Sequence, residues 1–136
     1  MDSQARRTLL DHARRAAEHA YAPYSNFPVG AALLLRDGSI VTGANIENAS
    51  YPLTSCAERS AVATAASAGH REIRAVAVSA PRSLGTSPCG ACRQVLNEFR
   101  PVGGDMVVIL DDGEDGIVTS LEELLPRAFG PRNFVG

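Results

Sequence analysis

Apolar residues recur near the start of the chain at the spacing of a helix. Over residues 3–20 they fall on one face, and charged and polar residues occupy the other. The apolar face consists of Leu9, Leu10, Ala13, Ala16, Ala17 and Ala20. The pattern predicts a first helix that packs one side on a core. The segment 21–27 contains Pro23 and is predicted to be a loop.

Runs of aliphatic and β-branched residues predict about five strands. Residues 29–36 and 40–44 flank Asp37-Gly38, a dipeptide typical of a tight hairpin turn. Residues 43–53 are polar and predict an irregular segment. Three further short apolar runs predict strands over residues 73–80, 106–110 and 117–119.

Signals for the start of a helix occur three more times. Ser55, Ser87 and Ser120 are each predicted to be an N-cap, Ser87 with a proline directly after it. The predicted helices cover residues 55–69, 87–99 and 120–125. The resulting order of helices and strands favours a mixed sheet with helices on both faces, which is a three-layer α/β/α sandwich.

Composition narrows the class of protein. At 136 residues and 45% hydrophobic, the chain is expected to form one domain over residues 1–136 with a core of its own. The net charge of -2, without a basic run, argues against nucleic acid as a partner. All 13 basic residues are Arg, which excludes chemistry that needs a lysine of this chain.

Cysteine use and the lack of long apolar runs bear on location. No run approaches the length of a membrane-spanning helix, and the first residues do not resemble a signal peptide, so no membrane partner is expected. Three cysteines, an odd number, suggest reduced thiols. Together these features predict a cytoplasmic protein.

The three cysteines fall in two short motifs that point to a metal. Cys56 lies two residues before Glu58 in a C-x-E motif, and Cys89 and Cys92 form a P-C-x-x-C motif. Three thiolates are one ligand short of a closed structural zinc site, which leaves a position for water. This pair of motifs is the signature of zinc deaminases. Zinc is therefore the expected cofactor, with Glu58 as the candidate catalytic residue.

Both motifs lie where helices are predicted to begin, and helix starts stabilise thiolates. Three thiolates outweigh the charge of one zinc ion, and a nearby cation would offset the excess. Arg59 directly follows the C-x-E motif, and we expect it to donate hydrogen bonds to the ligand thiolates.

Other interpretations of these residues stay open from sequence. The C-x-x-C pair alone fits a redox pair or half of a structural zinc site. Glu58 stands three residues after Ser55, the spacing of a helix capping box. The three histidines are candidates for a fourth ligand, although their flanking residues place them at the surface: His12, His19 and His70.

Five segments in order resemble the cytidine deaminase family, specifically its small three-cysteine, homotetrameric branch within the cytidine and deoxycytidylate deaminase superfamily. They are PYSNFPVG at 23–30, GANIENASY at 43–51, TSCAER at 54–59, SPCGACRQ at 87–94 and LLPRAFGP at 124–131. The resemblance covers nearly the whole chain. It departs at Ser55, where the family usually has an aliphatic residue, and over residues 81–86.

The resemblance implies roles for residues that would otherwise look ordinary. Phe27 would pack against the pyrimidine ring, and Asn45 and Glu47 would hold the ribose hydroxyls. The backbone of Ala57 and the carbonyl of Ser87 would contact the edge of the base.

The same resemblance implies an assembly. It predicts a homotetramer with one zinc ion per subunit and with the sites at subunit interfaces. Tyr51 and Phe134 would then reach into the pocket of a neighbouring subunit.

The implied activity is hydrolytic deamination of cytidine and deoxycytidine to uridine and deoxyuridine, with release of ammonia, in pyrimidine salvage. Glu58 would carry the protons. A related branch that deaminates the nucleoside blasticidin S shares the cysteine motifs and stays an alternative. Two other classes also remain: a zinc-stabilised interaction domain without catalysis, and a deaminase of polynucleotides, which the scarcity of aromatic residues disfavours.

Overall fold

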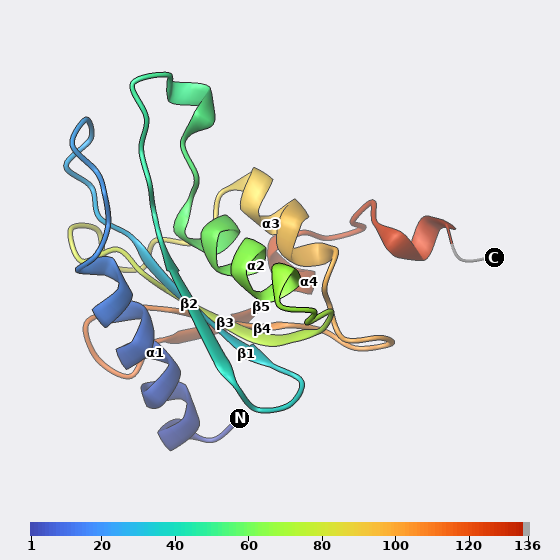
Figure 1. The fold of residues 1–136 in the computed structure, drawn as a ribbon. Helices are drawn as coiled ribbons and strands as arrows, with labels where there is room; N and C mark the ends of the chain where they lie inside the picture. The colour runs from blue at the N-terminus through green and yellow to red at the C-terminus, as the bar shows by residue number, and fades with distance from the viewer. Residues whose placement is uncertain (135–136) are drawn as a thin grey trace.

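A computed structural model of the chain describes residues 1–134 and contains four α-helices and five strands (Figure 1). Two short 3-10 helices, η1 (Tyr51–Leu53) and η2 (Pro131–Phe134), lie outside them. The order of elements agrees with the sequence prediction. In chain order they are α1 (Ser3–Ala17), β1 (Gly30–Leu35), β2 (Ile40–Ala44), α2 (Ala57–Ser67), β3 (Ile73–Ser79), α3 (Gly90–Asn97), β4 (Val107–Leu110), β5 (Ile117–Ser120) and α4 (Leu121–Leu124).

The strands form one mixed sheet in the order β2-β1-β3-β4-β5. The pair β3–β4 is parallel and is joined through α3, while the other three pairs are antiparallel. In the centre of the sheet Leu33 of β1 lies opposite Val41 of β2 and Val76 of β3. The sheet confirms the prediction of about five strands in mixed order.

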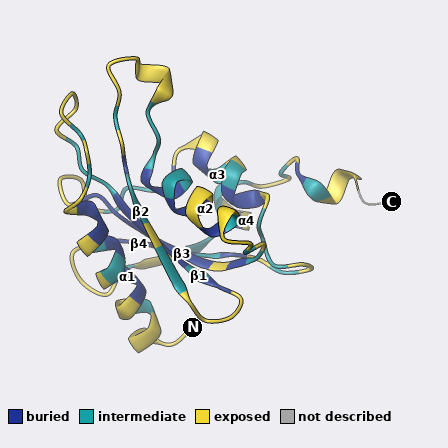
Figure 2. Cartoon of the chain, viewed as in Figure 1, coloured by how far each residue is buried: buried dark blue, intermediate teal, exposed yellow. Residues whose placement is uncertain are grey.

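Helices cover both faces of the sheet, which confirms the three-layer arrangement (Figures 1 and 2). On one face, Leu9, Leu10 and Ala13 of α1 pack on small strand residues such as Ala32 and Ala77. On the other face the strands present larger side chains to α2 and α3. The residues of this second cluster include Leu33, Leu35, Ala61, Val62, Val76, Val78, Leu96 and Val108.

Glycine in β2 lets α2 lie directly on the sheet. A Cβ at Gly43 would meet the backbone of α2, 2.4 Å from the nitrogen of Ala61 and 2.7 Å from the carbonyl oxygen of Ala57. Any larger residue would push the first turn of α2 away from the sheet. The position of Glu58, in that turn, therefore depends on the absence of a side chain at Gly43.

Two of the three predicted N-caps are wrong. The N-caps are Cys56 for α2 and Cys89 for α3, instead of Ser55 and Ser87. At Ser55 the backbone is still extended, since it exchanges two hydrogen bonds of 2.9 Å with Ile46. Ser87 instead accepts a hydrogen bond from Arg93 at 3.0 Å. Ser120 does cap α4 by accepting from the N–H of Glu123 at 3.2 Å.

Predicted ends of helices also differ by a few residues. The first helix ends at Ala17 instead of residue 20, and α3 ends at Asn97 instead of residue 99. Among the described residues, none of the helices combines the length and the apolar character needed to cross a membrane.

Candidate metal centre

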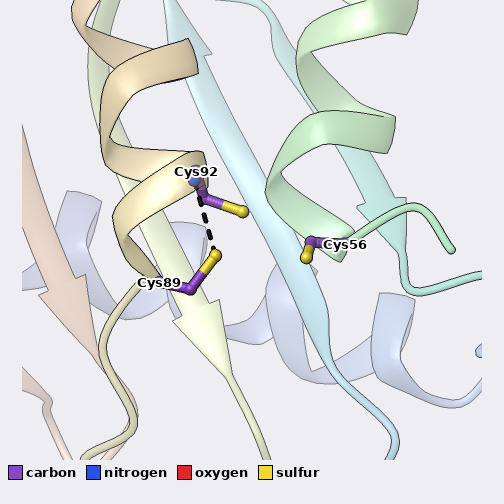
Figure 3. Close-up of side chains that lie close together, drawn as sticks. All are labelled: Cys56, Cys89 and Cys92. Carbon is purple, nitrogen blue, oxygen red and sulfur yellow. Dashed lines mark hydrogen bonds between the residues drawn. The ribbon is translucent and has the colours of Figure 1, made fainter. Parts of the chain in front are cut away.

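The three cysteines meet where α2 and α3 begin (Figure 3). Cys56 and Cys89 are the N-caps of the two helices, and Cys92 lies in the first turn of α3. Their sulfur atoms all lie within 4.8 Å of one another. Within residues 1–134, no histidine or carboxylate joins this group. None of the three histidines is buried, and none of them lies with the cysteines.

The geometry of the three sulfurs fits zinc. Zinc–sulfur bonds of about 2.3 Å separate the sulfurs of a tetrahedral site by about 3.8 Å, so these thiols need only small shifts to bind one ion. Cys92 is buried, Cys56 half-buried and Cys89 exposed, so the group opens toward one side. Three soft ligands at the base of an open cavity are the donor set of a catalytic zinc site.

The protein environment treats the thiols differently. Burial raises the pKa of the Cys92 thiol. Burial acts in the same sense on Cys89, but hydrogen bonds outweigh it and lower the pKa of that thiol. One of those bonds is donated by the backbone N–H of Cys92 to Cys89 Sγ at 3.5 Å. The start of α3 thus favours a thiolate at its cap, as metal binding requires.

Arg59 extends from α2 toward the same group. Its Nη2 donates hydrogen bonds to the carbonyl oxygen of Thr54 at 3.1 Å and to Cys56 Sγ at 3.6 Å. The bond to Cys56 also raises the pKa of the guanidinium. The structure therefore places a permanent positive charge beside one sulfur.

Glu58 is the second residue of α2, and the residue is 4% exposed. Burial raises the pKa of its carboxyl group above the ordinary value. The capping-box interpretation is wrong, because Ser55 lies outside the helix and its hydroxyl bonds Ser60 Oγ at 2.8 Å. Glu58 is a buried carboxyl group beside Cys92, in the first turn of the helix that Cys56 caps, and has no capping role.

A cavity of about 390 Å³ opens above the cysteines. It brings together eight of the predicted site residues, from four separate segments of the chain. The lining residues are Ser25, Phe27, Val29, Asn45, Glu47, Thr54, Cys56, Ala57, Glu58, Val78, Thr86, Ser87 and Cys89. A pocket of this size suits a small, partly aromatic ligand.

Glu47 holds the loop that carries Phe27. Its carboxylate accepts hydrogen bonds from the N–H groups of Tyr24 at 2.9 Å and Ser25 at 3.1 Å, and from the hydroxyl of Ser25. The bond from the Ser25 hydroxyl is the main cause that lowers the pKa of Glu47. Ser25 Oγ in turn accepts from the N–H of Phe27 at 3.1 Å. Glu47 is therefore an ionised acceptor at the side of the cavity.

Asn45 holds the same loop at Phe27 and Val29. Its Oδ1 accepts from the N–H of Val29, and its Nδ2 donates to the carbonyl oxygen of Phe27, both at 2.9 Å. The side chain is 8% exposed. One N–H of the amide remains for a ligand, because Nδ2 carries two hydrogens.

Two predicted residues lie away from this cavity. Tyr51 is exposed and stacks edge-to-face on Tyr24 with ring centres 5.9 Å apart, beside a neighbouring hollow of about 240 Å³ that Glu47 also lines. Phe134 is 77% exposed in η2 and contacts Phe129, with ring centres 5.6 Å apart. Neither residue lines the cavity of its own chain.

Sequence reasoning gave no role to several residues that shape the cavity. Ser25 and Thr54 stood inside the quoted motifs, and Thr86 lies directly before one of them. Arg93 fixes the start of α3 by donating to the carbonyl oxygens of Pro88 and Leu124, both at 2.8 Å, and to Ser87. Its place in the SPCGACRQ motif was the signal that could have identified it.

Comparisons with known proteins agree with this geometry. The family model "Cytidine and deoxycytidylate deaminase zinc-binding region" matches residues 3–109. The chain is 51% identical over 125 residues to the cytidine deaminase of Halalkalibacterium halodurans, covering 91% of this chain and 93% of the relative. It is 45% identical over 124 residues to that of Mycobacterium tuberculosis, covering 90% and 87%. The crystal structure of cytidine deaminase from Burkholderia pseudomallei superposes with a TM-score of 0.83 at 47% identity, covering 90% of this chain and 98% of that one.

Proposed function

The chain belongs to the cytidine and deoxycytidylate deaminase family, and we propose that it hydrolyses cytidine and deoxycytidine to uridine and deoxyuridine with release of ammonia. One observation carries the proposal most directly. A buried carboxyl group and two of three clustered thiols, Cys56 and Cys89, line one cavity, whose other wall carries an aromatic ring and two polar side chains, and the third thiol, Cys92, lies buried beside them. The enzyme is a zinc-binding hydrolase with a small-molecule substrate.

Cys56, Cys89 and Cys92 would hold one zinc ion per subunit. When bound, zinc acts as a Lewis acid that lowers the pKa of water toward neutrality. The role of Arg59 is to keep the thiolate of Cys56 from carrying excess charge, through the bond of 3.6 Å to its sulfur.

Glu58 would move the protons of the reaction. It accepts the proton that the attacking water loses and delivers it to ring N3, which makes C4 more electrophilic. The new bond joins the water oxygen to C4. Glu58 then passes the second proton of that oxygen to the amino group, the C4–N bond breaks, and ammonia leaves. Burial raises the pKa of Glu58 above its ordinary value, which favours a group that both takes and gives protons during the reaction.

The walls of the cavity would select the substrate. Phe27 contacts the face of the pyrimidine, while the backbone of Ala57 and the carbonyl of Ser87 contact its edge. Asn45 and Glu47 bind the ribose hydroxyls with the acceptor and N–H capacity that their loop contacts leave free. A ligand without a sugar would leave the free N–H of Asn45 and the remaining acceptor capacity of Glu47 unused, which disfavours its binding.

We also propose the assembly and the location in which the enzyme acts. The chain acts as a single catalytic domain over residues 1–136 in a cytoplasmic homotetramer of pyrimidine salvage, with neither nucleic acid nor membrane as a partner. Tyr51 and Phe134 are exposed and lie outside the cavity of their own chain, which leaves them free to contact the pocket of a neighbouring subunit.

A substrate panel tests the function. Cytidine, deoxycytidine, cytosine, blasticidin S and a short single-stranded oligonucleotide are followed by loss of absorbance, with zinc measured on the same preparation. We expect one zinc per chain and fast conversion of the first two compounds. Preference for blasticidin S or for the oligonucleotide would contradict the proposal, and so would zinc-loaded protein that converts none of them.

A further inference from the structure

The loop that carries Phe27 is held from two sides. Glu47 and Asn45 hold it from the segment that follows β2, through the contacts described above. Arg82 holds it from elsewhere, because its Nη1 donates a hydrogen bond to the carbonyl oxygen of Asn26. That carbonyl belongs to the residue directly before Phe27.

Arg82 comes from the opposite wall of the cavity. It lies in the connection between β3 and α3, residues 80–89, which also supplies Thr86, Ser87 and Cys89 to the cavity. This connection and the loop of residues 21–29 lie at the same end of the sheet (Figure 1). The Arg82 contact therefore spans the two walls between which a ligand would lie.

The connection that carries Arg82 has a defined shape of its own. The N–H of Gly85 donates to the carbonyl oxygen of Asp111 at 2.8 Å. The hydroxyl of Thr86 donates to the carbonyl oxygen of Ser83 at 2.6 Å. Arg82 thus extends from a loop that is fixed to the end of β4. Its hydrogen bond to Asn26 therefore holds the loop of Phe27 against a fixed part of the fold.

The other end of the contact is a strained residue. Asn26 has a φ of +53°, in the left-handed region that side-chain-bearing residues adopt infrequently. Such a conformation persists where surrounding contacts hold it. Because Asn26 directly precedes Phe27, the dihedral angles that Arg82 stabilises also set where the Phe27 ring lies in the cavity.

We propose that Arg82 is a positioning residue that joins the two walls of the pocket and fixes Phe27 against the base of the bound nucleoside. The inference rests on the proposed function. It concerns substrate binding alone, since the cysteines and Glu58 are held by α2 and α3 and not by this loop. It also falls in the segment where the chain departs most from the family pattern.

Kinetics of Arg82→Ala with cytidine test the proposal. We expect the KM to rise about three- to tenfold, the effect of losing one charge-assisted hydrogen bond at an exposed site, with kcat and zinc content within about twofold of wild type. Arg82→Lys keeps one cationic donor and should recover at least half of the lost affinity. The matched control is Arg74→Ala, which removes an exposed arginine of β3 whose ion pair is with Glu72.

Each outcome supports or overturns the inference. An unchanged KM in Arg82→Ala, or an equal rise in Arg74→Ala, overturns it while the activity of the wild type stands. A rise in KM that occurs only with substrates that carry a 5′-phosphate also overturns the inference, because Arg82 would then bind the substrate directly. Wild-type protein that is inactive on every compound of the panel would contradict the proposed function itself.

Discussion

The cavity has a floor and a rim that are built by different means. The floor consists of Cys56, Glu58, Cys89 and Cys92, all within one turn of the start of α2 or α3. Those helices pack on the face of the sheet opposite α1 through residues such as Ala61 and Leu96, both of which have no exposed area. Secondary structure and core packing therefore set the positions of the floor.

The rim consists of Phe27, Asn45, Glu47 and Arg82, which lie in the connections between elements. Here hydrogen bonds between side chains and backbone groups set the geometry, and most of them are exposed to water. A hydrogen bond of that kind contributes about 0.5–1.5 kcal/mol. Substitutions in the floor should therefore abolish zinc binding or lower kcat, while substitutions in the rim should raise KM.

Removal of a proposed zinc ligand should give the largest effect. Cys92→Ala deletes the buried sulfur of the three, and we expect the purified variant to carry less than about a tenth of an equivalent of zinc and to show no detectable deamination. Metal analysis and the cytidine assay measure both. Far-UV circular dichroism serves as the control for folding, and a folded variant with full zinc would remove Cys92 from the ligand set.

Neutralising Glu58 should give the next largest effect and separate metal binding from proton transfer. Glu58→Gln keeps the shape of the side chain, so we expect normal zinc content and a kcat lower by about 10²- to 10⁴-fold. The exposed Glu18→Gln, at the end of α1, is the matched control. A kcat near that of wild type would show that Glu58 does not carry the protons.

Changing Glu47 tests the rim and should act mainly on binding. In Glu47→Gln the amide can no longer accept every hydrogen bond from Tyr24 and Ser25, and it binds a ribose hydroxyl less strongly than a carboxylate does. We expect the KM for cytidine to rise roughly ten- to a hundredfold with zinc content unchanged. A fall in kcat with an unchanged KM would contradict the division between floor and rim.

Free cytosine sharpens that experiment because it has no ribose. If Glu47 acts through the ribose alone, turnover of cytosine should be the same in both proteins. If Glu47 acts through the Phe27 loop, the turnover of cytosine should fall as well. The two contributions of one carboxylate can be separated in this way.

The order of elements and the mixed sheet were predictable because each element has a local signal. The aliphatic and β-branched runs of β1 and β3 and the apolar face of α1 are examples, and these elements lie where the patterns placed them. The predicted N-cap of α2 was one residue too early and that of α3 two residues too early. The reason is not local: Ser55 has the chemistry of an N-cap, but its pairing with Ile46, nine residues away, keeps its backbone extended.

The floor was predictable from residue spacing, whereas the rim was not. The C-x-E and C-x-x-C motifs identify the candidate metal ligands by their spacing alone, and the three sulfurs do lie close together. Phe27, Asn45 and Glu47 came only from family resemblance, since an isolated loop residue carries no pattern. The Arg82 contact joins segments 56 residues apart through a backbone carbonyl, which no side-chain motif records.

The smallest effect on turnover should come from the support beneath the rim, at Asp111. Its backbone carbonyl anchors the connection that carries Arg82, and its buried side chain binds Arg14 at 2.8 Å and Ser79 at 2.7 Å. Burial alone would raise the pKa of Asp111, but the hydrogen bonds from Arg14 and Ser79 outweigh it and hold the pKa below its ordinary value. In Asp111→Asn the backbone anchor remains, so we expect turnover at pH 7 within about twofold of wild type.

Stability against pH should reveal the role of the Asp111 side chain. Because the pKa is lower in the folded state, its stabilisation is fully present above the unfolded value of about 3.9 and is lost as the pH falls through the folded value. Melting temperatures from pH 7 downward should therefore fall more steeply below about pH 4 in wild type than in Asp111→Asn. Loss of zinc at low pH affects both proteins and cancels in the difference. The exposed Asp115→Asn is the control, and parallel curves for wild type and Asp111→Asn would show that the ion pair with Arg14 does not stabilise the support of the rim.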